Sequence, residues 1–130
     1  MATKTEKLRA LSNTQLLEKA KESIAVPSVC SFAEGLYRRV VVEMPDDCIL
    51  QLAQYQQLLK CLNSVSACIM EGIGYSDTQQ HIRFLKMARG SALESSSHAR
   101  CLGRWEPECL ALVEMVNSYV IDILDDYVEQ

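Results

Sequence analysis

Two side chains in this sequence have the types and the spacing of metal ligands. Glu94 and His98 stand four residues apart in a stretch with helical periodicity, so they would share one helix face. Di-iron bundles, however, use Glu-x-x-His pairs on two helices together with further glutamates, and the sequence has no Glu-x-x-His pair. His81, the other histidine, lies at a different helical angle. We therefore predict no metal site and no cofactor. The alternative is an enzyme or metal-binding bundle that uses Glu94 and His98.

Two glycines, Gly72 and Gly74, could form a loop that holds a phosphate group. Such a loop needs a strand before its glycines, and further glycines or a Gly-Lys-Ser/Thr sequence after them. Here a long helical pattern precedes the glycines, and neither continuation follows. Gly72 and Gly74 are predicted instead to end one helix and to turn the chain towards the next.

Nucleophiles are present but lack the surroundings of a catalytic site. Ser95, Ser96 and Ser97 lie near His98, but no nucleophile-elbow motif surrounds them, and close helix packing explains them better. The six cysteines form no Cys-x-x-Cys pair, which argues against structural zinc, and we expect reduced thiols that pack as small apolar residues. We predict that the protein is not an enzyme.

Basic side chains gather on one predicted helix, although the net charge of the chain is −4. At 100° per residue, four of them fall within an arc of about 60°. They could follow a phosphate backbone and so bind nucleic acid. The preferred alternative is a solvated face, or ion pairs with the acidic last helix of the same or a neighbouring subunit. The four residues are Lys86, Arg89, Arg100 and Arg104.

The elements that must position these side chains are helices. The chain is 48% apolar but only 6% aromatic and has few glycines and prolines, which favours helix over sheet. Its 130 residues suit one domain. Apolar periodicity predicts a short helix or ordered arm over 12–25, followed by four long helices. The long helices are expected at 28–44, at 47–71, from a Ser76 capping box to Gly103, and from Pro107 to the C-terminus.

The apolar positions of two predicted helices exceed what one bundle core needs. The second helix carries Leu58 and Val65 beside its main seam, and the fourth carries Leu110, Ile121 and Leu124. A stripe of this breadth is typical of burial on two sides, by the bundle and by a partner. We therefore predict an all-α fold: an antiparallel up-and-down four-helix bundle over 28–130, preceded by an N-terminal arm over 1–27. The bundle is predicted to assemble as a homo-oligomer through these five residues.

The sequence has no feature that would direct it to a membrane. No apolar run approaches the roughly 20 residues that span a bilayer. The N-terminus has no apolar segment typical of a secretory signal. We expect a cytoplasmic protein.

One stretch, SVSACIMEGIGYSDTQQHIRFLKMARGSALE, resembles a known family of four-helix bundles, the proteins encoded in intervening sequences of bacterial ribosomal RNA. Accessory variability proteins of diversity-generating retroelements are more distant relatives. The family pattern runs S-I-P-A-N-I-A-E-G-x-G, a polar turn, R-F-L and G-S-L-x-E. Ser66 and Cys68 stand where the family has Pro and Asn. The positions that match are Ser64, Ala67, Ile69, Glu71, Gly72, Gly74, Arg83, Phe84, Leu85, Gly90, Ser91 and Glu94.

The resemblance implies a four-helix bundle that assembles as a ring, with the pentamer as the family pattern, and it implies no catalytic activity. The retroelement relatives bind a reverse transcriptase and nucleic acid, so RNA or a protein that processes nucleic acid is the partner implied. Glu71, Gly72, Gly74 and Arg83 would form a structural turn motif. We expect Glu71 to accept hydrogen bonds from the backbone or from Arg83 across the turn.

Overall fold

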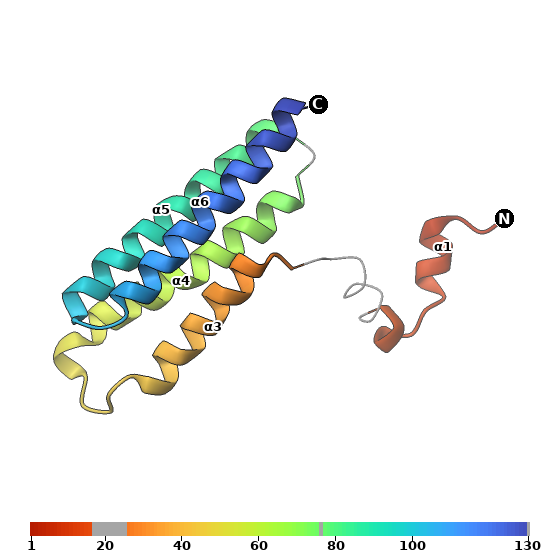
Figure 1. Ribbon diagram of the computed structural model, residues 1–130. Helices are drawn as coiled ribbons and strands as arrows, with labels where there is room; N and C mark the ends of the chain where they lie inside the picture. Colours follow the sequence, from red (N-terminus) through yellow and green to blue (C-terminus); the bar gives the residue numbers. More distant parts are fainter. Residues whose placement is uncertain (17–25, 76, 130) are drawn as a thin grey trace.

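The computed structural model describes residues 1–16, 26–75 and 77–129, and these residues form a short N-terminal helix and four long helices (Figure 1). No strand occurs in those three ranges, so the prediction of an all-helical chain is confirmed. The run Arg39–Glu43, whose valines resemble a strand locally, belongs to the first long helix. The elements are α1 (Lys4–Arg9), α3 (Ser28–Glu43), the 3-10 turn η1 (Ile49–Gln51), α4 (Leu52–Ile73), α5 (Thr78–Leu102) and α6 (Glu106–Glu129).

The N-terminal segment begins with a short helix that is stabilised locally. The hydroxyl of Thr3 accepts a hydrogen bond from the Glu6 amide, and the Glu6 carboxylate accepts one from the Thr3 amide, both at 3.1 Å. This reciprocal pair is a capping box at the start of α1. Most of the helix predicted over 12–25 lies outside the described residues.

Two predicted helix starts differ from those observed. α4 begins at Leu52 and not at Asp47, because the chain after Pro45 first forms a turn and then η1, and no side chain caps either element. At α5 the capping residue is Asp77, whose carboxylate accepts a hydrogen bond from the Gln79 amide at 2.9 Å. The predicted cap, Ser76, lies outside the described residues.

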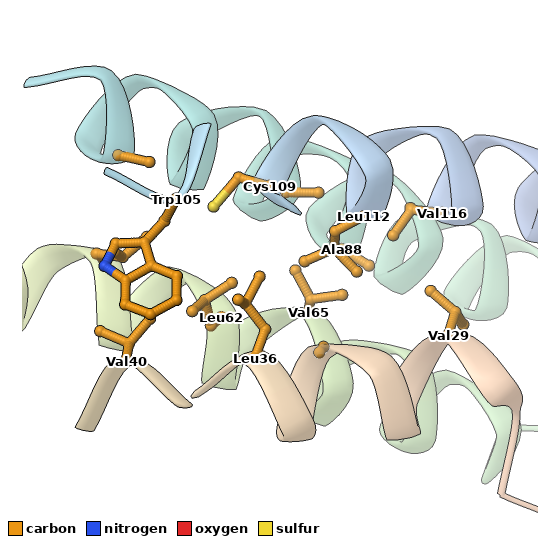
Figure 2. Close-up of a cluster of buried hydrophobic side chains, with 14 of the residues drawn as sticks. Val29, Leu36, Val40, Leu62, Val65, Ala88, Trp105, Cys109, Leu112 and Val116 are labelled. Atoms are coloured by element: carbon orange, nitrogen blue, oxygen red, sulfur yellow. The ribbon is translucent and has the colours of Figure 1, made fainter. Parts of the chain in front are cut away.

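The four long helices lie side by side and bury one apolar core (Figure 1). Each long helix packs against two others: α3 against α4 and α6, and α5 against α4 and α6. α5 presents mainly small side chains to this core, and these let α4 approach closely. Figure 2 shows apolar side chains from all four helices that point towards one another, among them Leu36, Val65, Ala88 and Leu112.

A row of polar contacts along α4 and α5 defines their relative direction. Gln54 contacts His98, Cys61 contacts Glu94 at 3.4 Å, and Ser64 contacts Ser91 at 2.9 Å. The residue number rises on α4 as it falls on α5, so these two helices are antiparallel.

The prediction that Leu58 and Val65 form an oligomer interface is wrong. Both side chains are fully buried within the single chain, and Figure 2 shows Val65 in the core among side chains of the other helices. The physical reason is that α4 packs against α3 on one side and α5 on the other, so a broad apolar stripe on α4 is covered without a second subunit.

The turn between α5 and α6 anchors the end of α3. Gly103 ends α5 in the left-handed conformation, with φ 71°, as its position predicted. Trp105 also has a positive φ, 75°, yet its indole is buried against the core beside Val40 (Figure 2). The guanidinium groups of Arg39 and Arg104 lie 5.3 and 4.8 Å from the centre of the indole ring. This cluster fixes the position of the turn against the end of α3.

Candidate functional site

Two of the four predicted nucleic-acid contacts are engaged within the chain. The Arg100 guanidinium pairs with the Glu106 carboxylate at 3.1 Å, at the start of α6. Arg104 pairs with the Glu43 carboxylate at 3.7 Å and also donates to the Glu43 carbonyl at 3.2 Å. The Arg100 contact agrees with the alternative reading, ion pairs with the acidic last helix, whereas the partner of Arg104 is the last residue of α3.

The other two predicted contacts, Lys86 and Arg89, are exposed and pair with no acidic side chain in the part of the chain that the structure describes. Lys86 lines a shallow surface hollow on the N-terminal half of α5 together with Arg83, Ile82 and Met87. This end of α5 therefore offers cationic groups beside apolar side chains to solvent.

The corner between α4 and α5 is formed by close packing and not by the predicted Glu71–Arg83 contact. Gly72 is buried, and a Cβ atom there would lie 3.0 Å from the His81 ring and 3.2 Å from the Phe84 Cβ. A Cβ at this position would therefore force His81 and Phe84 to move by a few tenths of an ångström. The Glu71 and Arg83 side chains are both exposed and form neither an ion pair nor a hydrogen bond with each other. The expected link to Arg83 is absent, and within the turn it is the Glu71 carbonyl that accepts a hydrogen bond, from the Gly74 amide at 3.0 Å.

A buried histidine connects this corner to the end of α6. The Nδ1 atom of His81 lies 2.6 Å from the Tyr127 hydroxyl, and the two rings meet edge to face. The Nε2 atom is buried without a hydrogen-bond partner. Burial lowers the pKa of His81 below its ordinary value of 6.5, because the charged imidazolium would lose its hydration. No sequence pattern indicates this pair, since its two residues lie 46 positions apart.

Glu94 and His98, the alternative metal ligands, do share one face of α5, and α4 adds a third ligand type to them. Cys61 is buried, and its Sγ donates to the Glu94 carboxylate at 3.4 Å. Potential ligand atoms of all three residues lie within 4.8 Å of one another. The Gln54 amide hydrogen-bonds to Nδ1 of His98. We refer to Cys61, Glu94 and His98 as the Cys–Glu–His cluster.

The thiol of this cluster is protonated at neutral pH when no cation is bound. The pKa of Cys61 is raised to about 12, mainly by burial and also by the hydrogen bond to Glu94, because a thiolate would face a carboxylate. No short-range motif links Cys61 to His98, since the two residues lie on different helices. The signal that could have suggested the contact is the place of Cys61 between Leu58 and Val65 on the broad apolar face of α4.

The remaining predicted interface residues lie on the outer face of α6. Leu110, Ile121 and Leu124 are 44, 56 and 36% exposed, and Val128 continues the same face at 84%. We call these four residues the α6 stripe. Unlike Leu58 and Val65, they are not covered by the helices that the structure describes.

Two further observations bear on the class of protein. In the described ranges, no helix has both the length and the apolar character required to cross a bilayer. Comparison of the chain with family models, with curated proteins and with solved structures finds no match.

Proposed function

We propose that this protein is a non-enzymatic homo-oligomer, a binding or scaffolding module whose four long helices form an antiparallel up-and-down bundle. The bundle arrangement is supported by the antiparallel contacts of α4 and α5 and by the pairwise packing of the four helices around one core. The observation that carries the proposal of assembly is the α6 stripe.

The α6 stripe has the geometry of a helix–helix contact. At 100° per residue its four side chains fall within an arc of about 60°, and the stripe runs for about 27 Å along the helix. Asn117 lies within the same arc, so Leu110 is separated from the apolar group formed by Ile121, Leu124 and Val128. Exposed apolar side chains gathered on one helix face are typical of an interaction site in a folded chain. Identical copies provide the simplest partner, because every copy presents the same stripe. A ring of five copies is the assembly that the resemblance to the intervening-sequence proteins implies.

Sedimentation velocity and light scattering on the purified chain test the assembly. We expect the wild type to form a discrete oligomer and the double variant Ile121→Glu, Leu124→Glu to be a monomer, because a buried, unpaired carboxylate opposes association. Leu93→Glu is the matched control. Leu93 is 49% exposed on α5, outside the stripe, so this variant should assemble as the wild type does. A strictly monomeric wild type contradicts the proposal.

A second candidate function is association with nucleic acid through the exposed end of α5. The resemblance implies such a partner, and the specific observation that favours it is the pair of unengaged cations, Lys86 and Arg89. Fluorescence anisotropy with labelled RNA and DNA would measure it. If these two side chains contact phosphates, Lys86→Glu, Arg89→Glu should weaken binding and lower the salt slope by about 2. Lys60→Glu, on the exposed face of α4, is the control. Equal binding by wild type and double variant removes this function.

A further inference from the structure

We propose that the Cys–Glu–His cluster between α4 and α5 is a binding site for one divalent transition-metal ion, Zn²⁺ by its donor set. Cys61, Glu94 and His98 would be the ligands, and water would complete a four-coordinate shell. Thiolate, imidazole and carboxylate are the three protein ligands of zinc, whereas magnesium and calcium prefer oxygen alone. The site lies within one chain, so the proposal is independent of the oligomeric state.

The spacing of the ligand atoms already approaches that of a tetrahedral site. Zinc–sulfur and zinc–oxygen bonds of ordinary length place the two ligand atoms about 3.5 Å apart at a tetrahedral angle. Cys61 Sγ and Glu94 Oε2 are 3.4 Å apart. The proton that the thiol shares with this carboxylate occupies the position that a cation would take, and metal binding would release that proton. The ligand atoms lie within 4.8 Å of one another. Metal binding would require rotations of the Glu94 and His98 side chains that bring the widest pair closer.

Two helices hold the three ligands in place. Glu94 and His98 lie one turn apart on α5, so both project towards the same edge of the contact with α4. Small core residues of α5, such as Ala92 and Ser95, let α4 lie close enough for Cys61 to reach them. A ligand pair on one helix and a single ligand on its neighbour make a site that depends on the packing of both helices.

The surroundings of His98 provide the outer shell that metal-binding histidines require. Gln54 lies two helical turns before Cys61 on α4, and its side-chain amide is hydrogen-bonded to Nδ1 of His98. The structure places the amide nitrogen of Gln54 beside Nδ1. In the metal-bound form the amide would turn so that its oxygen accepts Nδ1–H, and Nε2 would then be the ligand atom. Such a partner fixes the tautomer and orientation of the imidazole.

Access from solvent is also present. Cys61 is 4% exposed and forms the base of the site, His98 is half-buried, and Glu94 is exposed at the surface. A metal ion can therefore enter past Glu94 and His98 and reach the thiol. The fourth position then faces solvent, as it does in zinc sites that retain a bound water.

Titration of the full-length protein with Co²⁺ tests the site, in a phosphine reductant and without thiol reagents. We expect one Co²⁺ per chain, with a thiolate-to-cobalt charge-transfer band in the near ultraviolet and the visible bands of a tetrahedral ion. Added Zn²⁺ should displace the Co²⁺ and abolish both the charge-transfer band and the visible bands. Cys61→Ala should eliminate the charge-transfer band, and Gln54→Leu should weaken binding about 10- to 100-fold.

Cys68→Ala is the matched control, because Cys68 is also a buried thiol on α4, seven residues further along. It should bind Co²⁺ as the wild type does, and far-ultraviolet circular dichroism should show the same helix content in all variants. A wild type without a saturable band overturns the proposal. So does a band that survives Cys61→Ala, or one that Cys68→Ala reduces equally, since either result places the metal on other thiols.

Discussion

The buried imidazole of His81 is the side chain whose protonation should affect the stability of the fold most directly. It sits against Gly72, contacts the Tyr127 hydroxyl and has one ring nitrogen without a partner. Burial lowers the pKa of His81, so the folded protein binds this proton only at a lower pH than the unfolded chain, whose histidine titrates near 6.5. Since the unfolded state then binds more protons, stability must fall as pH decreases through 6.5 towards the lower, folded-state pKa. Above that window this group has no effect.

Urea unfolding of wild type and His81→Gln at several pH values between 7.5 and 5 would measure this effect. The free energy of unfolding of the wild type should decrease across the range more steeply than that of His81→Gln. His98 and the carboxylates are common to both proteins, so the difference between the two curves isolates His81. Parallel curves would contradict the prediction.

Trp105 is the second residue on which the described fold depends strongly. Its indole is 6% exposed although its backbone is in the left-handed region. Replacing Trp105 by Ala should lower the free energy of unfolding by about 3–5 kcal/mol, because a large buried side chain is lost. Arg39→Gln should cost only about 0.5–1 kcal/mol, since it removes one cation–π contact at a partly exposed site. Comparable losses in denaturant unfolding would argue against Trp105 as the anchor of the α5–α6 turn.

At the scale of the elements, two glycines near the ends of α4 and α5 matter for different reasons. Gly103 has φ 71° with nothing close to its missing Cβ, so its requirement is conformational. Gly72 has an ordinary helical backbone, but a Cβ there would crowd His81 and Phe84. The sequence predicted both positions as helix ends. Gly103 is one, whereas α4 continues through Gly72 to Ile73 and is capped by Gly74. The close packing at Gly72 exists only once α5 has packed against α4.

Alanine substitutions should distinguish the need for a left-handed backbone at Gly103 from the ordinary helix propensity of a glycine inside a helix. Gly103→Ala should destabilise the protein by about 1–2 kcal/mol, the cost of a left-handed backbone for a residue with a Cβ. Gly90→Ala is the control, since it lies inside α5 with open space around it, and should stabilise by about 0.5–1 kcal/mol. Thermal unfolding of the two variants measures both effects. A neutral result for Gly103→Ala would mean that the turn adopts another conformation.

At the scale of the whole molecule, self-association and stability should be linked. If each copy covers the α6 stripe of another, the free energy of association adds to the stability of the folded chain. Dilution must then lower the apparent stability. The melting temperature of the wild type should therefore rise with protein concentration. The melting temperature of the double variant Ile121→Glu, Leu124→Glu should not change with concentration. If the melting temperature of the wild type is also independent of concentration, the stripe contributes nothing to the stability of the folded state.

The proposed assembly and the proposed metal site occupy different parts of the molecule. The stripe lies on the outer face of α6, whereas the Cys–Glu–His cluster lies between α4 and α5. The experiments on the two proposals can be interpreted separately, because the variants in the α6 stripe leave every proposed metal ligand unchanged. A scaffold that also binds a transition metal would have two independent routes to stability.

Much of this protein follows from the sequence by itself, because local pattern decides local structure. The 3.6-residue periodicity predicted four long helices. Gly103 and Pro107 marked the turn between the last two, since each has backbone properties that act without tertiary contacts. The exposure of Leu110, Ile121 and Leu124 followed from a stripe that lies outside the core face of α6.

What only the tertiary structure decided depends on which helix faces which. Leu58 and Val65 resembled an interface until α3 and α5 were seen to cover both sides of α4. Arg100 and Arg104 resembled free cations until Glu106 and Glu43 were brought beside them. Cys61 joined Glu94 and His98 across 33 residues of chain. Periodicity determines the face of a helix on which a side chain lies, but its neighbours across that face are set by the packing of the whole chain.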